Sequence, residues 1–104
     1  MPERRRVRRS AFGGVAEITA FHPDTFIVVP TAELSRYGCF VTTNASMPIG
    51  TKVSIRISNE DKVFNASGEV VYVLPESGMG IRFTTTAPED VAVLEAWLRK
   101  QIEF

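Results

Sequence analysis

The sequence has little of what metal centres and disulfide scaffolds are built from. It contains one cysteine, Cys39, and one histidine, His22, among its 104 residues. A single cysteine excludes an intramolecular disulfide and a cysteine-based zinc cluster, and one histidine cannot complete a metal site. We therefore expect no metal and no other cofactor in this protein.

The chain also lacks a long hydrophobic run and a net charge. No stretch approaches the ~18 apolar residues of a membrane-spanning helix. The arginines near the start suggest a twin-arginine export signal, but Glu17 and Asp24 interrupt the sequence that follows, so no apolar segment of such a signal forms. The 12 basic and 12 acidic residues balance. These absences predict a soluble cytoplasmic protein without membrane insertion.

Signatures of catalysis are missing as well. His22 stands at the edge of a predicted turn without a partner nucleophile, and Ser35 is not part of a G-x-S-x-G turn. The glycines of "FGG" and "GMG" lie between predicted strands rather than before a helix, which excludes a phosphate-binding loop of the usual kind. We expect a binding module rather than an enzyme.

Most of the chain has the period of β-strands. Val53, Ile55 and Ile57 alternate with polar residues, and Gly, Pro, Asn and Asp separate this segment from others rich in β-branched and aromatic residues. The strands are expected at 15–22, 25–31, 38–43, 52–58, 63–74 and 78–84. Six short strands in so short a chain predict a closed or nearly closed antiparallel β-barrel.

The period changes near the end of the chain, where a helix is expected at about 87–103. Thr86 and Glu89 fit a capping box, and Glu95 and Arg99 have the spacing of an ion pair on the exposed face. The apolar side is formed by Val91, Leu94, Trp97, Leu98 and Ile102. The predicted fold class is therefore all-β with a C-terminal helix.

The first residues form the most unusual segment, "ERRRVRR", with five arginines in seven positions. We interpret residues 1–10 as a flexible arginine-rich arm and residues 11–104 as a single barrel domain. Arg5 and Arg9, like Arg4 and Arg8, have the spacing R-x-x-x-R, which in an extended arm places both guanidinium groups on one side. Such groups suit phosphate oxygens and the edge of guanine, although a solvated basic tail is the common fate of such a segment.

A second polar segment, "ELSRYG", lies between the second and third predicted strands. The Glu33 carboxylate can accept from guanine N–H groups, the Ser35 hydroxyl can donate or accept, and Gly38 permits a close backbone approach. Taken alone, this segment is equally typical of an ordinary surface turn.

Together these two segments resemble the PilZ domain family, whose members are receptors for the bacterial second messenger cyclic di-GMP. The segment "ERRRVRR" is similar to the family's arginine arm, and "ELSRYGCFV" is similar to its D/N-x-S-x-x-G motif with the strand after it. The resemblance implies a six-stranded barrel with a helix after it. It also implies that Arg5, Arg9, Ser35 and Gly38 bind the ligand, with Arg4 as an additional guanidinium.

Glu33 departs from the family pattern, which has Asp or Asn at this position. The added methylene moves the carboxylate by roughly 1.5 Å, the length of one C–C bond.

Two functions follow: a cyclic di-GMP receptor whose arm changes conformation and signals to an unidentified partner protein, or a divergent interaction adaptor that no longer binds nucleotide. Nucleic-acid binding by the arm is a third possibility, against which the neutral total charge counts. Tyr72 could offer its ring to a base or pack on the barrel.

Overall fold

The computed structural model describes residues 10–22 and 24–101, and the arginines at positions 4, 5, 8 and 9 lie outside these ranges. The elements in chain order are β1 (Ser10–Ala11), β2 (Val15–Phe21), β3 (Asp24–Leu34), β4 (Gly38–Thr42), β5 (Lys52–Asn59), β6 (Lys62–Leu74), β7 (Gly78–Thr85) and α1 (Pro88–Gln101). All six predicted strands are present as β2 to β7, and β1 is an addition that the sequence did not predict.

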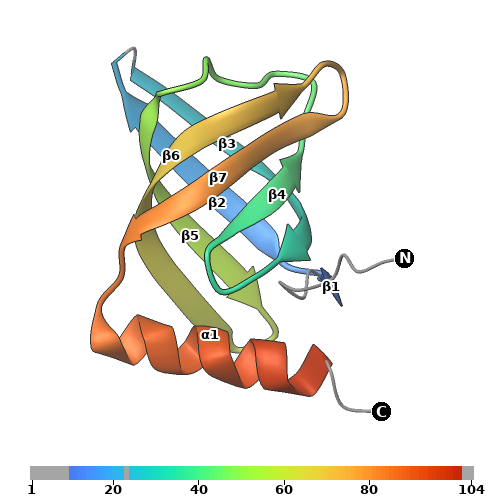
Figure 1. Ribbon diagram of the computed structural model, residues 1–104, viewed down its shortest axis with the longest axis vertical. Coiled ribbons are helices and arrows are strands. Elements are labelled where there is room, and N and C mark those ends of the chain that lie inside the picture. Colours follow the sequence, from blue (N-terminus) through green and yellow to red (C-terminus); the bar gives the residue numbers. More distant parts are fainter. Residues whose placement is uncertain (1–9, 23, 102–104) are drawn as a thin grey trace.

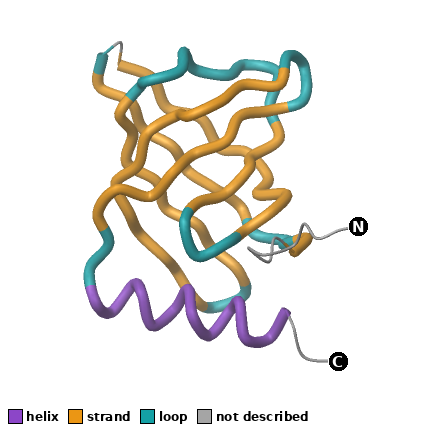
Figure 2. Tube along the Cα trace, in the orientation of Figure 1, coloured by secondary structure: helices purple, strands orange, loops and turns teal. Residues whose placement is uncertain are grey.

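The six longer strands close into an antiparallel barrel. The hydrogen-bonded order runs β3–β2–β5–β6–β7–β4, and β4 pairs back onto β3 to complete the circle. Figures 1 and 2 show the strands wound around a common axis, with α1 across one end of the barrel. The predicted fold class is therefore confirmed.

The barrel interior is filled by alternate residues of neighbouring strands. In β5, Val53, Ile55 and Ile57 are buried while the residues between them are exposed. Ile55 pairs with Ile18 of β2 on one side and with Ala66 of β6 on the other. Because paired residues share a face, each such row contributes apolar side chains to one interior layer. These rows of interior side chains specify the register of the strands. The same register brings together, on the outer face, the polar residues that are described below.

Helix α1 covers one end of the barrel through part of its predicted apolar side. Leu94 and Trp97 are buried, and Trp97 packs on Phe64 of β6 with ring centroids 6.4 Å apart. Val91, predicted on the buried side, is 40% exposed. The predicted capping box makes Thr86 the N-cap of the helix. The Val91 N–H instead donates to the Ala87 carbonyl, so Ala87 is the N-cap and the helix begins one residue later.

The same helix is anchored at its first turn by a side chain. The Asp90 carboxylate accepts a hydrogen bond from the backbone N–H of Asn65 at 2.9 Å, which ties α1 to β6. With 14 residues α1 is short, and no helix in residues 10–22 and 24–101 is long and apolar enough to cross a membrane.

Candidate ligand-binding site

The segment predicted to bind ligand forms a tight connection between β3 and β4. The Ser35 N–H donates to the Gly38 carbonyl at 2.9 Å. The Ser35 hydroxyl oxygen accepts a hydrogen bond from the Tyr37 N–H at 3.2 Å. The same hydroxyl donates to the Gly38 carbonyl oxygen at 3.4 Å. Ser35 is 5% exposed. The structure thus brings Ser35 and Gly38 into direct contact, and the serine hydroxyl stabilises the turn itself.

Gly38 is needed because β4 approaches β7 closely at this point. A Cβ added at Gly38 would lie 3.1 Å from Arg82 Cα and still closer to the Ile81 carbonyl oxygen. Both are backbone atoms that cannot rotate away. A second contact holds the turn to the same strand, since the Phe83 N–H donates to the Tyr37 carbonyl at 2.8 Å. The motif is therefore fixed against β7.

Glu33 lies on the outer surface of β3, two residues before Ser35. It pairs with Phe40 of β4, while the neighbouring pair, Leu34 and Cys39, is buried. Since successive side chains of a strand alternate between its faces, Glu33 and Phe40 both point outward. Glu33 thus shares the outer face with the turn but is not among the residues that line the pocket described next.

A pocket of about 220 Å³ opens on the outer face of β4, β7 and β6. Ser35, Gly38, Phe40, Tyr72 and Arg82 contribute to its walls. The Phe40 and Tyr72 rings are stacked, with centroids 6.1 Å apart and planes 17° from parallel. The pocket therefore combines an aromatic wall, a cation and a hydrogen-bonded turn, which are the groups that a nucleotide base and phosphate use.

Tyr72 packs on the barrel, which is one of the two alternatives that the sequence left open, and the base contact stays a prediction. Its ring lies over Gly80, where an added Cβ would be 2.7 Å from Tyr72 Cδ2. The residue nevertheless remains 38% exposed. Gly80 pairs with Phe40 on one side and with Tyr72 on the other, so the absence of a side chain at Gly80 lets the two rings approach. Packing on the barrel and partial exposure of the residue are therefore compatible.

Two arginines stand beside the turn, and each contacts a carboxylate. Arg82 pairs with Gly38 in the sheet, and its guanidinium contacts Glu69 of β6 at 3.0 Å. Arg36, in the turn, reaches Glu95 of α1 with N–O distances of 2.5 Å and 3.4 Å. Glu95 was expected to pair with Arg99, so the sequence missed this contact between the turn and the helix.

The arm enters the described structure next to the same turn. In β1, Ser10 pairs with Leu34 and Ala11 pairs with Glu33. The arm therefore joins the barrel beside the residues that begin the motif. Arg4, Arg5 and Arg9 themselves fall in the part of the chain that the structure does not describe.

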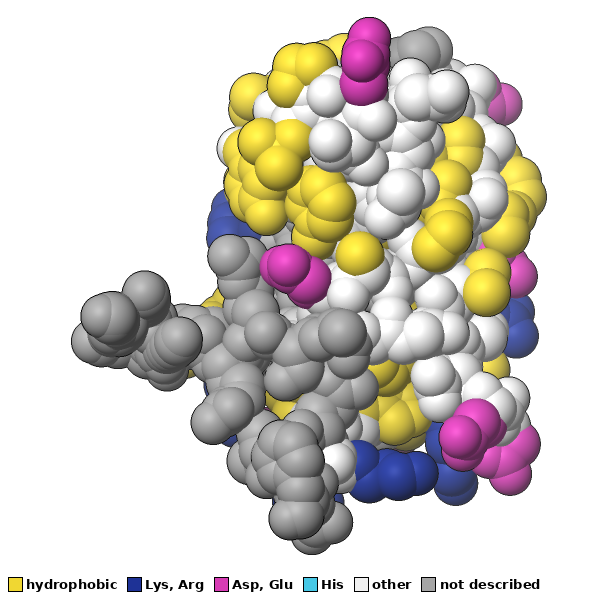
Figure 3. Space-filling view, turned by 90° about the vertical axis from the view of Figure 1, so that its right-hand side faces the viewer, with side chains coloured by type: hydrophobic (Ala, Val, Ile, Leu, Met, Phe, Trp, Pro, Cys, Tyr) yellow, Lys and Arg dark blue, Asp and Glu magenta, His cyan; other side chains and the backbone are white. Residues whose placement is uncertain are grey.

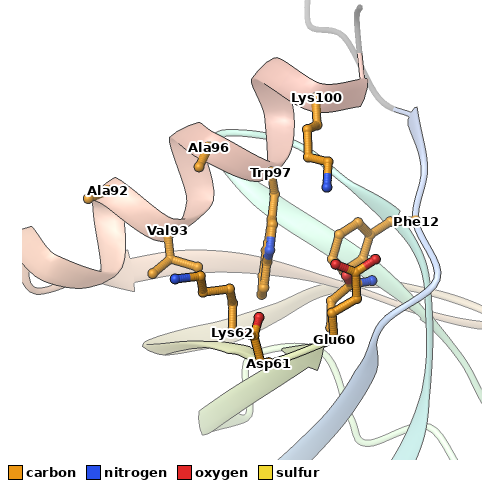
Figure 4. Close-up of a pocket in the computed structure, with 10 residues that line it drawn as sticks. Phe12, Glu60, Asp61, Lys62, Ala92, Val93, Ala96, Trp97 and Lys100 are labelled. Carbon is orange, nitrogen blue, oxygen red and sulfur yellow. The ribbon is translucent and has the colours of Figure 1, made fainter.

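A larger pocket of about 610 Å³ lies under α1 (Figure 4). Phe12, directly after β1, packs on Trp97 with ring centroids 5.0 Å apart. Glu60 and Asp61 stand at the rim together with Lys62 and Lys100. Because these charges are of both signs, the pocket offers no preference for an anionic ligand. The contact between Phe12 and Trp97 in this pocket links the residue that follows β1 to the helix.

The residues that sequence analysis missed are Arg82, Phe40 and Arg36. Arg82 and Phe40 sit in correctly predicted strands, and alternation already placed them opposite the buried neighbours Ile81 and Cys39. What the sequence could not show was the register, which sets them beside Gly38 and Tyr72. Figure 3 shows one side of the molecule, where several hydrophobic side chains are exposed on the upper half and basic side chains near the lower end lie beside acidic ones.

Solved structures with a similar fold include two proteins. The Bacillus subtilis inhibitor of motility, MotI/DgrA, matches with a TM-score of 0.76 at 18% identity, over 97% of this chain and 53% of that one. The PilZ domain of Escherichia coli YcgR with c-di-GMP matches with a TM-score of 0.73 at 17% identity, over 95% and 92% of the two chains. A further YcgR structure, in complex with c-di-GMP, gives 0.75 at 18% identity, over 94% and 46%.

This chain thus spans about half the length of the MotI/DgrA chain and of the chain in the second YcgR structure. A comparison with proteins of curated function found no match. The model of the PilZ domain family, in contrast, matches residues 3–100, which include the arginine segment, the Ser35–Gly38 turn, the barrel and nearly all of the helix. The chain therefore belongs to the PilZ domain family.

Proposed function

We propose that this protein is a receptor for cyclic di-GMP, rather than an enzyme, and that it passes the signal to a partner protein. The observation that carries the proposal is the position of β1. Ser10 pairs with Leu34, so an arginine-rich segment joins the barrel beside the Ser35–Gly38 turn. Family membership and the cyclic di-GMP complexes of YcgR, which has a similar fold, support the same ligand.

The pocket on the barrel is suited to part of such a ligand. Its volume of about 220 Å³ is below the roughly 300–1,000 Å³ of pockets that enclose a whole small molecule. The exposed part of the Tyr72 ring can stack on a guanine base, and the Arg82 guanidinium can meet a phosphate. The rest of the ligand would then be covered by the arm, with Arg5 and Arg9 binding phosphates and guanine edges and Arg4 adding a further guanidinium.

Ligand binding by the arm would couple the nucleotide to the surface of the domain. Ordering a segment costs conformational entropy, which only an attractive ligand repays, so the ordered arm forms when the nucleotide is present. Phe12 lies directly after β1 and packs on Trp97 of α1. Through this contact a change in the conformation of the arm can be transmitted to the helix. We place this receptor in the bacterial cytoplasm, where cyclic di-GMP acts.

Isothermal titration with cyclic di-GMP tests the proposal. Wild type should release or absorb heat with a saturable isotherm, and Arg5→Ala or Arg9→Ala should abolish it. Arg56→Ala is the matched control, because Arg56 is an exposed arginine on β5, outside the pocket. Absence of heat from the wild type at about 100 μM protein, a concentration that detects even micromolar affinity, would refute the proposal.

The second candidate is a divergent adaptor that has kept the barrel and lost the nucleotide. The observation that favours it is Glu33, which is longer than the family's Asp or Asn and lies on the outer face outside the pocket lining. A displacement of roughly 1.5 Å exceeds the ~0.5 Å that binding geometry tolerates. Under this alternative the wild type shows no heat with cyclic di-GMP, and Glu33→Asp creates binding.

A further inference from the structure

Arg36 is placed where its side chain can serve two different partners. Its neighbours in the chain, Ser35 and Tyr37, both line the pocket on the barrel. Its own guanidinium turns away from that pocket and contacts both carboxylate oxygens of Glu95, at 2.5 Å and 3.4 Å. Because consecutive Cα atoms are ~3.8 Å apart, a long arginine side chain rooted here can also reach a ligand in the pocket.

The ion pair between the turn and α1 is open to solvent. The side chain of Arg36 is 56% exposed and that of Glu95 is 33% exposed. Exposed pairs of this kind are weak, since water screens the attraction and both side chains lose rotational freedom. A phosphodiester of cyclic di-GMP carries one negative charge, as a carboxylate does, and its two free oxygens suit the guanidinium fork in the same bidentate way, so it can replace the Glu95 carboxylate.

We propose that Arg36 is a further ligand-binding residue of the nucleotide site, and that Glu95 binds its guanidinium until an anionic ligand replaces the Glu95 carboxylate. This inference rests on the proposed function. The arriving phosphate takes the guanidinium from Glu95, so the free energy of the Arg36–Glu95 pair is subtracted from that of ligand binding. Glu95 is therefore an internal competitor of the ligand.

The exchange also has a consequence for α1. Glu95 lies on the helix, which is otherwise held to the barrel by Trp97 on Phe64 and by Asp90 on Asn65. When Arg36 leaves, the Glu95 carboxylate becomes a negative charge without that partner on the helix surface. The ligand thereby changes the charge that α1 presents to a partner protein.

Titration of cyclic di-GMP into four proteins tests this mechanism: wild type, Glu95→Gln, Arg36→Ala and the double variant. Removing the competitor in Glu95→Gln should tighten binding by up to about five-fold, which corresponds to about 1 kcal/mol. Arg36→Ala should weaken binding. In the double variant the Glu95→Gln change should have no effect, because the arginine on which it acts is missing.

Glu89→Gln is the matched control. It removes one negative charge from the first turn of the same helix, where Glu89 is exposed, and should leave the affinity unchanged. Thermal melting of each variant verifies that it is folded. Unchanged or weaker binding by Glu95→Gln, or a tightening that persists without Arg36, overturns the role of Arg36 while leaving the proposed function intact. Loss of heat in every protein, wild type included, overturns the proposed function and this inference together.

Discussion

Replacing Gly38 by alanine tests why the motif ends in glycine. From the sequence, the glycine could serve a close approach of the ligand to the backbone. The structure assigns it a different task, because an added Cβ would lie 3.1 Å from both Arg82 Cα and the Ile81 carbonyl carbon, and closer still to the Ile81 oxygen. Real Cβ atoms essentially never approach other atoms within 3.0 Å, so β4 would have to move away from β7.

The cost of this movement can be estimated from its two parts. Overpacking against atoms that cannot rotate costs about 1–3 kcal/mol. Stretching one or two backbone hydrogen bonds between β4 and β7 adds about 1 kcal/mol for each. We therefore expect Gly38→Ala to lower the free energy of unfolding by about 3 kcal/mol. For a domain of this size that corresponds to a fall in Tm of roughly 12–24 °C.

Urea unfolding followed by fluorescence is the appropriate assay, because Trp97 is the only tryptophan and is 7% exposed in the folded chain. Gly13→Ala is the matched control, since a Cβ at Gly13 would have no atom within 4 Å. It should change the stability by less than about 0.5 kcal/mol. If Gly38→Ala cost no more than Gly13→Ala and impaired only ligand binding, the structural explanation of the glycine would be wrong.

Three further predictions concern single side chains. Thr31 is 1% exposed and its hydroxyl has no hydrogen-bond partner in the described ranges, so Thr31→Val should raise the free energy of unfolding in urea by about 1 kcal/mol. Burial raises the pKa of the Cys39 thiol from 9.0 to about 12. As the pH rises, the thiol of the unfolded chain loses its proton before the thiol of the folded chain. The contribution of Cys39 to the free energy of unfolding is therefore complete below pH 9 and falls as the pH rises toward 12. Cys39→Ala should remove this part of the loss of stability at alkaline pH, measured by urea unfolding at successive pH values. Gly80→Ala should displace the Tyr72 ring and weaken cyclic di-GMP binding in titration, with a smaller stability loss than Gly38→Ala, because the obstructing atoms belong to a side chain that can rotate.

The elements were predictable because their signal is local. Val53, Ile55 and Ile57 alternate in the sequence with the period of a half-buried strand, and the structure buries all three. Strand β1 could not be found in this way, because two residues carry no period. Its existence depends on pairing with β3, and such pairing between distant segments is not encoded in either segment alone.

The site was predictable only in part, for a related reason. Ser35 and Gly38 are three residues apart, so a turn signature was enough to bring them together. Arg82 reaches the same place only through the β4–β7 register, and Arg36 meets Glu95 across 59 positions of sequence. The i,i+4 rule favoured Glu95 with Arg99 on α1, but a partner from another element lay within reach of the carboxylate.

Under the proposed function, the charges around the pocket give the arm a specific task. The two arginines beside the turn, Arg36 and Arg82, are each in contact with a glutamate, so neither adds a net positive charge to the site. A dianionic nucleotide that met this surface alone would have to break an existing ion pair for each new one, with little net gain. The segment at positions 4 to 9 carries five arginines and no acidic residue, so its sequence supplies the positive charge that these two paired arginines do not. In a chain of zero net charge, attraction would then come from the arm, while the barrel supplies the aromatic wall and the fixed turn that select what is bound.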